Sequence, residues 1–209
     1  MPIRYFFIAS LMALSMWPVK TAAQDKKNEV SFTAGSIGVG DQNVSGTNLP
    51  NNTLHFGDGI TFEANYSRWF RRWDALGLAV EVPVAINPDE DLQFGANLIP
   101  ESYYAYFITP SIRAQFVPTA LLSPWVSVGA GLGHFTPSSN LEFYGKNSGS
   151  GKTVSVFQIG GGFDVRIWKS FKVRGEVRDF NSGVPPLNVN TGKSRQGNLF
   201  SGGGIVWMF

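Results

Sequence analysis

Three places in the sequence carry residue types that could perform chemistry. The first, 149–153, reads Gly-Ser-Gly-Lys-Thr and ends like a phosphate-binding loop. That motif requires a glycine five residues before Gly151, where this chain has Lys146. It also requires a helix at its end, whereas Thr153 begins a segment with strand character. The segment is therefore interpreted as a flexible loop, and nucleotide binding is not expected.

The second and third places are the two histidines and a short acidic run. An acyl hydrolase needs a base, a nucleophile and an orienting carboxylate, but His134 is not followed by a serine two residues later. The run Asp89, Glu90 and Asp91 offers three carboxylates on one expected loop, and calcium takes six or more oxygens. No catalytic, cofactor-binding or metal-binding residue is predicted, and no cofactor is expected.

The remaining candidates are charged residues that recur at alternate positions in otherwise apolar segments. They are Glu63, Glu81, Arg113, Asp164, Arg166, Arg174, Glu176 and Arg178. Alternate residues of a strand share one face, so these charges would line one surface of a sheet. In a narrow interior, charges of both signs are tolerated when they are paired and hydrogen-bonded. We predict a lumen charge network that either fills and stiffens a barrel or lines a narrow gated channel.

The segments that carry these charges alternate apolar and polar side chains. In 60–69, for example, Ile60, Phe62 and Ala64 alternate with polar residues. Similar alternation marks eight candidate strands, at 30–39, 60–69, 76–84, 103–116, 126–133, 157–167, 172–178 and 199–209. The glycine triplets 160–162 and 202–204, each inside a candidate strand, are interpreted as sites that relieve crowding or permit coiling.

The links between the candidate strands alternate between short and long. Short links are expected at 71–74, 118–123 and 169–170, and long polar ones at 40–59, 87–102, 136–152 and 181–196. Short turns at one end with long loops at the other are typical of outer-membrane barrels. We therefore predict an all-β, closed antiparallel up-and-down transmembrane barrel, with its apolar face toward lipid and its polar face toward the lumen.

Aromatic residues gather near the expected strand ends. Beside the short turns or at the C-terminus lie Trp69, Trp73, Trp125, Trp168 and Trp207. Amphipathic rings favour the headgroup level, so these tryptophans are predicted to form a girdle at the periplasmic interface. A second girdle at the outer interface is expected from Tyr103, Tyr104, Tyr106, Phe135, Phe180 and Phe200.

The first 23 residues resemble a cleaved secretory signal, which divides the chain into 1–23 and a barrel domain at 24–209. Arg4 precedes an apolar stretch, and Thr21 to Ala23 supply small residues before a cut at Gln24. The chain has no cysteine, so neither a lipid anchor on cysteine nor a disulfide is available. The signal takes two of the 17 basic residues and none of the 15 acidic ones, and the near-neutral remainder argues against a nucleic-acid partner.

The chain ends on Phe209, preceded at alternate positions by Trp207 and Ile205, and the segment 171–180 reads Phe-Lys-Val-Arg-Gly-Glu-Val-Arg-Asp-Phe. With these features it resembles the OmpA-like family of eight-stranded outer-membrane barrels. The resemblance implies a barrel-only member without the peptidoglycan-binding domain. It also implies that Phe209 is the assembly signal read by the outer-membrane assembly machinery, and that outer-membrane lipid and lipopolysaccharide surround the protein.

The expected function is therefore that of an integral protein of the bacterial outer membrane, non-enzymatic, with a structural or surface-interaction role. A narrow gated channel for ions or small solutes is the alternative, and an outer-membrane lipid-modifying enzyme comes third. The sequence names no partner for the long loops.

Overall fold

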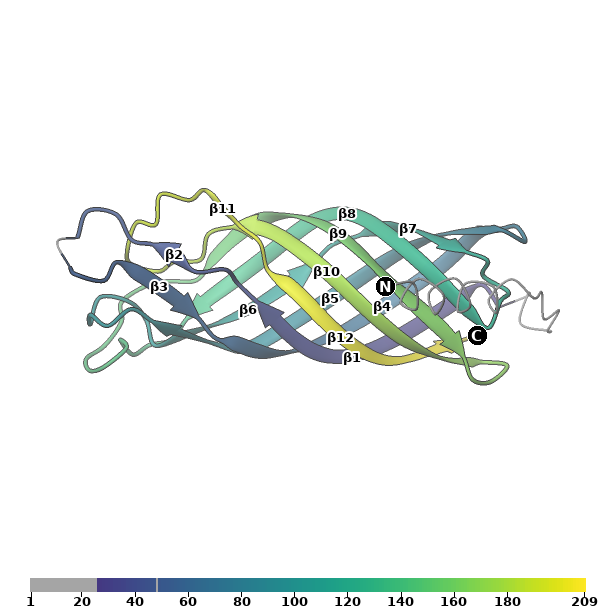
Figure 1. Cartoon of the computed structure of the whole chain (residues 1–209), viewed down its shortest axis with the longest axis horizontal. Coiled ribbons are helices and arrows are strands. Elements are labelled where there is room, and N and C mark those ends of the chain that lie inside the picture. The colour runs from purple at the N-terminus through teal and green to yellow at the C-terminus, as the bar shows by residue number, and fades with distance from the viewer. Residues whose placement is uncertain (1–25, 48) are drawn as a thin grey trace, which may run out of the picture.

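The protein is a single elongated barrel, seen in a computed structural model that describes residues 26–47 and 49–209 (Figure 1). The predicted signal segment lies outside these residues. The strands are β1 (Asn28–Gly38), β2 (Gln42–Asn43), β3 (Thr53–Phe56), β4 (Asp58–Arg72), β5 (Leu76–Gln93), β6 (Ser102–Ile108), β7 (Ser111–Phe116), β8 (Leu122–Pro137), β9 (Lys152–Arg166), β10 (Phe171–Gly183), β11 (Arg195–Gln196) and β12 (Leu199–Met208). No helix among the described residues has the length and apolar character to cross a membrane.

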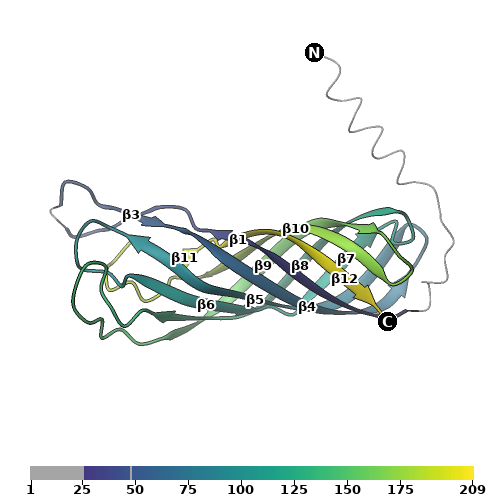
Figure 2. The ribbon, with the colours of Figure 1, turned by 90° about the horizontal axis from the view of Figure 1, so that it is seen from below.

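Eight long strands of the barrel wall, called staves below, close into a ring, which confirms the predicted fold class (Figures 1 and 2). β6 and β7 form one stave, interrupted at Thr109 and Pro110, and the others are β1, β4, β5, β8, β9, β10 and β12. Closure comes from antiparallel pairing of the first stave with the last, from Glu29 opposite Met208 to Gly38 opposite Leu199. Every neighbouring pair is antiparallel, so no stave has an open edge.

The outer surface of the ring is apolar and the inner surface is largely polar. Phe32, Phe62, Val80 and Ile112 are half exposed on the outside. On β9 the outward Phe163 flanks Asp164, which is buried in the interior, so the predicted alternation of faces holds there. An apolar exterior around a hydrogen-bonded, edgeless sheet suits a hydrocarbon surrounding, where an unpaired backbone group would be costly.

The second long loop begins farther along the chain than the sequence pattern predicts. β5 runs to Gln93, well past the expected end of its strand, and β2, β3 and β11 are short strands inside expected loops. The exposed apolar side chains of β5 end at Ile86, so the last part of this strand projects beyond the apolar band at the long-loop end. The links at the other end of the barrel are short (Figures 1 and 2). Asp89, Glu90 and Asp91, expected in a loop, lie on the projecting part of β5.

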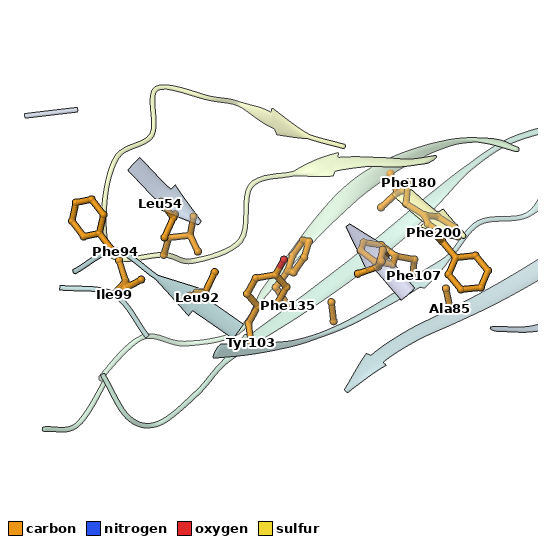
Figure 3. Close-up of a cluster of buried hydrophobic side chains, with 14 of the residues drawn as sticks. Leu54, Ala85, Leu92, Phe94, Ile99, Tyr103, Phe107, Phe135, Phe180 and Phe200 are labelled. Carbon is orange, nitrogen blue, oxygen red and sulfur yellow. The ribbon is translucent and has the colours of Figure 1, made fainter. Parts of the chain in front are cut away.

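The interior has two layers of different chemistry. The half nearer the short turns is filled by buried charged side chains, including Arg113, Arg174 and Arg178. The half nearer the long loops is filled by a cluster of buried apolar side chains, among them Phe107, Phe135 and Phe180 (Figure 3). The sequence pattern predicts only the charged layer.

Candidate functional site

One group of lumen charges lies near the short turns and centres on two carboxylates. Arg174 forms two hydrogen bonds to Asp164, from Nε to Oδ1 at 2.8 Å and from Nη2 to Oδ2 at 3.1 Å. Lys172 Nζ lies 3.5 Å from the same carboxylate and 2.8 Å from Oε1 of Glu29, which also pairs with Arg113. All five side chains are buried, so each charge is compensated within the lumen.

A second group surrounds Arg178 in the middle of the barrel. Its guanidinium lies 3.3 Å from Glu63, 2.8 Å from Glu81 and 3.1 Å from Glu176, measured between nitrogen and oxygen. Arg113 Nη1 lies 3.6 Å from Oε2 of Glu81 and so links the two groups. Arg178 on β10 reaches Glu63 on β4 and Glu81 on β5 across the lumen, whereas Glu176 lies two residues away on β10 itself.

Seven of the eight charged residues singled out in the sequence therefore meet in this network. The eighth, Arg166, lies at the end of β9, where its Nη2 donates to the carbonyl of Pro118 at 2.9 Å. It belongs to the rim at the short turns. The network has two further members, Glu29 and Lys172, which are not predicted from the sequence. Lys172 lies two residues before Arg174 and faces the lumen like it. Glu29 stands at the start of a weakly alternating segment, and the polar Ser31 and Thr33 on the same face are the signal that identifies it.

Two of the five tryptophans predicted for the periplasmic girdle line the lumen instead. Trp69 is 4% exposed and Trp125 is 1% exposed, whereas Trp73, Trp168 and Trp207 are 48%, 72% and 48% exposed on the outside. The girdle prediction is therefore wrong for Trp69 and Trp125. The reason is strand parity, since Trp69 follows Glu63 by an even number of residues and shares its inward face.

The two buried indoles act as surfaces for the lumen cations. The guanidinium carbons of Arg174 and Arg178 lie 5.0 and 4.9 Å from the ring centre of Trp125. Arg72 lies 4.3 Å from the ring centre of Trp69. A cation over an indole face is attracted by the ring quadrupole, and the attraction grows when water is excluded. The indoles thus complete the compensation of the guanidinium groups.

Glycines on the inward face leave space for these large side chains. A Cβ built at Gly77 would overlap the ring of Trp69, and one built at Gly160 would lie 2.8 Å from Cγ of Arg178. The first glycine triplet therefore contributes room in the lumen, in line with the crowding that its sequence pattern suggested.

The apolar layer corrects the second girdle prediction. Tyr103, Phe135, Phe180 and Phe200 are buried inside the barrel, and only Tyr104 and Tyr106 of that set face outward. Phe107 stacks on Phe180 with 5.1 Å between ring centres and meets Phe135 edge to face at 5.7 Å. These rings lie inside the barrel in one cluster with Leu54, Leu92 and Ile99, which are nearer the long loops (Figure 3).

The acidic run of β5 is separated by the same alternation. Asp89 and Asp91 are exposed, whereas Glu90 is buried beyond the apolar band and accepts a hydrogen bond from Asn87 Nδ2 at 2.7 Å. Burial, together with the nearby Asp58 and Asp91, raises the pKa of Glu90 to about 7. No cluster of three or more metal-ligating side chains occurs in the described part of the chain.

His134 faces outward near the long-loop end, where its Nδ1 lies 2.8 Å from the hydroxyl of Thr153 and its ring stacks on Tyr106. His55 pairs instead with Asp41, at 2.9 Å between Nδ1 and Oδ2. The two histidines therefore lie in different settings. Neither joins the lumen charge network.

Comparison with known proteins gives one family match and several structural likenesses. A family model described as the outer membrane protein beta-barrel domain matches residues 7–201. Neisserial surface protein A is 14% identical, with a TM-score of 0.53 over 87% of this chain and 97% of that one. OprG from Pseudomonas aeruginosa is 12% identical, with a TM-score of 0.49 over 90% of this chain and 99% of that one.

Ail, the attachment invasion locus protein of Yersinia pestis, is 15% identical, with a TM-score of 0.46 over 87% of this chain and 99% of that one. At 14% identity the likeness to neisserial surface protein A concerns the fold alone. No curated protein sequence matches the chain.

Proposed function

The chain belongs to the outer membrane protein beta-barrel domain family, and we propose that it is a closed, non-enzymatic barrel that presents its long loops at the bacterial surface. The observation that carries this proposal is the filled lumen. Charged side chains occupy one half and stacked aromatic rings the other. An eight-stranded barrel has an interior just wide enough for side chains, so such a filling supports a lumen that does not conduct.

In this proposal the lumen residues stabilise the barrel, and the long loops make the interactions at the cell surface. Ion pairs that join distant staves resist the splaying of the ring, because separating the staves would leave buried charges without partners. The membrane-facing surface contacts outer-membrane lipid and lipopolysaccharide, and the chain reaches the membrane through a cleaved signal and the assembly machinery. N-terminal sequencing of the membrane-extracted protein is expected to begin at Gln24, and a membrane protein that retains Met1 would contradict this route.

Planar-bilayer recording tests the closed lumen. Purified, refolded protein is expected to give no discrete conductance steps. A variant that carries Phe107→Ser and Phe180→Ser, which removes the stacked pair of the apolar layer, serves as the comparison. Steps from the unmodified protein would contradict the proposal.

A narrow channel is the second candidate function, and one observation favours it. Glu63 is buried, and neither of its carboxylate oxygens has a hydrogen-bond partner among the described residues, apart from the ion pair with Arg178. A buried carboxylate with a single ion-pair partner would be stabilised by a cation that enters the lumen. Cation-selective steps that disappear in Glu63→Gln would establish this function.

A further inference from the structure

Two of the long loops form one joined platform at the end of the barrel. Glu142 Oε1 accepts hydrogen bonds from the backbone N–H groups of Phe94 and Gly95, at 3.0 and 3.3 Å. In return, Asn97 Oδ1 accepts from the N–H groups of Phe143 and Tyr144, at 3.0 and 3.2 Å. These reciprocal contacts hold the segment after β5 against the segment after β8.

The platform carries an apolar patch, made of Leu98, Phe143 and Tyr144. These side chains are 47%, 59% and 76% exposed, although they lie on loops beyond the apolar band. Exposed apolar patches mark interaction sites, and this one lies on loops, outside the wall that the bilayer covers. Aromatic residues are also enriched among the anchors of protein interfaces.

A pocket of about 530 Å³ lies beside the patch and is bordered by Phe143. Its walls include three carboxylates from three segments, Asp91 on β5, Glu101 before β6 and Glu142 on the loop after β8. None of the described residues that line it is a lysine or an arginine, and its one histidine, His55, pairs with Asp41 outside the pocket. The pocket is therefore negatively charged beside an apolar rim.

One oxygen of the pocket lacks a partner. Glu142 Oε1 is engaged by the two backbone donors, whereas its Oε2 is shielded from solvent and has no hydrogen-bond partner among the described residues. A shielded carboxylate oxygen without a donor is costly, and a donor supplied from outside would satisfy it. A guanidinium or ammonium group provides both the donor and the opposite charge.

We propose that this pocket and patch form a docking site for a cationic, amphipathic polypeptide segment, whose lysine or arginine enters the pocket while its apolar residues cover Leu98, Phe143 and Tyr144. The choice of occupant follows from charge complementarity with Asp91, Glu101 and Glu142, joined to an aromatic rim. The inference rests on the proposed surface-interaction function and names the chemistry of the partner.

The test uses the refolded full-length barrel in nanodiscs of zwitterionic lipid, with a fluorescent peptide that alternates lysine and arginine with leucine and tryptophan. Binding is measured by anisotropy against a counterpart in which glutamate replaces every basic residue. The cationic peptide is expected to bind on the order of tenfold more tightly than the acidic one at low salt, and the difference is expected to shrink as salt rises.

Matched variants locate the binding. Asp91→Asn with Glu101→Gln is expected to weaken binding on the order of tenfold, because both are exposed acids that need no repacking. Phe143→Ser is expected to weaken it at every salt concentration. Asp89→Asn removes one charge from the same end of the barrel outside the pocket and is expected to leave binding unchanged.

Two results would overturn the site. One is equal binding of the two peptides, and the other is equal loss from Asp89→Asn and from the pocket variants. Equal binding to empty nanodiscs would assign the peptide to lipid and overturn it as well. Bilayer recording of the same sample separates this failure from failure of the proposed function, because a silent barrel without peptide binding removes only the docking site.

Discussion

Arg178 should be the most costly residue to remove from the lumen charge network. Arg178→Ala would leave three carboxylates around one vacated position, and Glu63 has no other cation in an ion pair among the described residues. Arg174→Ala also strands Asp164, but Lys172 Nζ at 3.5 Å and Gln115 Nε2 at 3.2 Å remain beside that carboxylate. Breaking a buried pair costs about 3–5 kcal/mol. We therefore expect about 3 kcal/mol for Arg174→Ala and about 5 kcal/mol or more for Arg178→Ala.

The assay is urea unfolding of the barrel in lipid vesicles, followed by tryptophan fluorescence and by the compact band on a semi-native gel. Replacing both members of one pair, Arg174→Met with Asp164→Leu, should cost less than the sum of the single changes, because no unpaired charge then remains. Equal costs for Arg174→Ala and Arg178→Ala, or strict additivity within the pair, would refute the account. Either result would mean that water, instead of the opposite charges, compensates these residues.

Four further predictions address other parts of the molecule. Because the pKa of Glu90 is raised to about 7, the folded state holds a proton that the unfolded state has already released. The free energy of unfolding should therefore fall as the pH rises from about 4.5 to 7 and then level off. Urea midpoints measured against pH should show this fall in the unmodified protein and lose it in Glu90→Gln. Val80→Arg places a cation on the lipid face and should cost roughly 2–4 kcal/mol in vesicle refolding, and a harmless outcome would invert the assignment of faces. Gly77→Ala should destabilise the barrel by overlap with Trp69 and recover when Trp69→Leu is added, as judged by thermal midpoints; no recovery would place the clash elsewhere. Deleting Phe209 should lower the amount of heat-modifiable barrel assembled in cells more than that refolded in detergent, and equal yields in cells would remove its role as an assembly signal.

The period of two along the chain predicts most of the barrel. Eight staves, their inward charges and the alternation of short and long links all follow from which side of a strand each residue faces. The same parity applied to Trp69 and Trp125 places them inside, but the preference of tryptophan for a membrane interface suggested the outside. The position of a residue along a strand sets its depth in the membrane, whereas its parity sets whether it faces the lipid or the lumen. The preference of tryptophan for the interface concerns only the depth.

The apolar layer could not be predicted in the same way. Alternation normally distinguishes a lipid face from a polar lumen, but near the long loops both faces are apolar. Phe107 and Ile108, for example, are adjacent, one buried in the lumen and the other exposed outside. The rings that fill this layer come from β6, β8, β10 and β12, and their proximity depends on ring closure. The pocket has the same origin, since its carboxylates converge only when two loops meet.

The cross-lumen position of Glu29 bears on how the ring can close correctly. Glu29 lies on the first stave, and its partners Arg113 and Lys172 lie on β7 and β10, so these pairs form only when the strands curl round to meet. A slip of one residue between β1 and β12 would turn Glu29 toward lipid and deprive both cations of their nearest carboxylate, because Arg113 would keep only Glu81 and Lys172 only Asp164. The backbone ladder by itself would tolerate such a slip, because every residue offers the same donor and acceptor. The buried charges thus penalise a misregistered closure of the barrel and favour a single register between the first strand and the last.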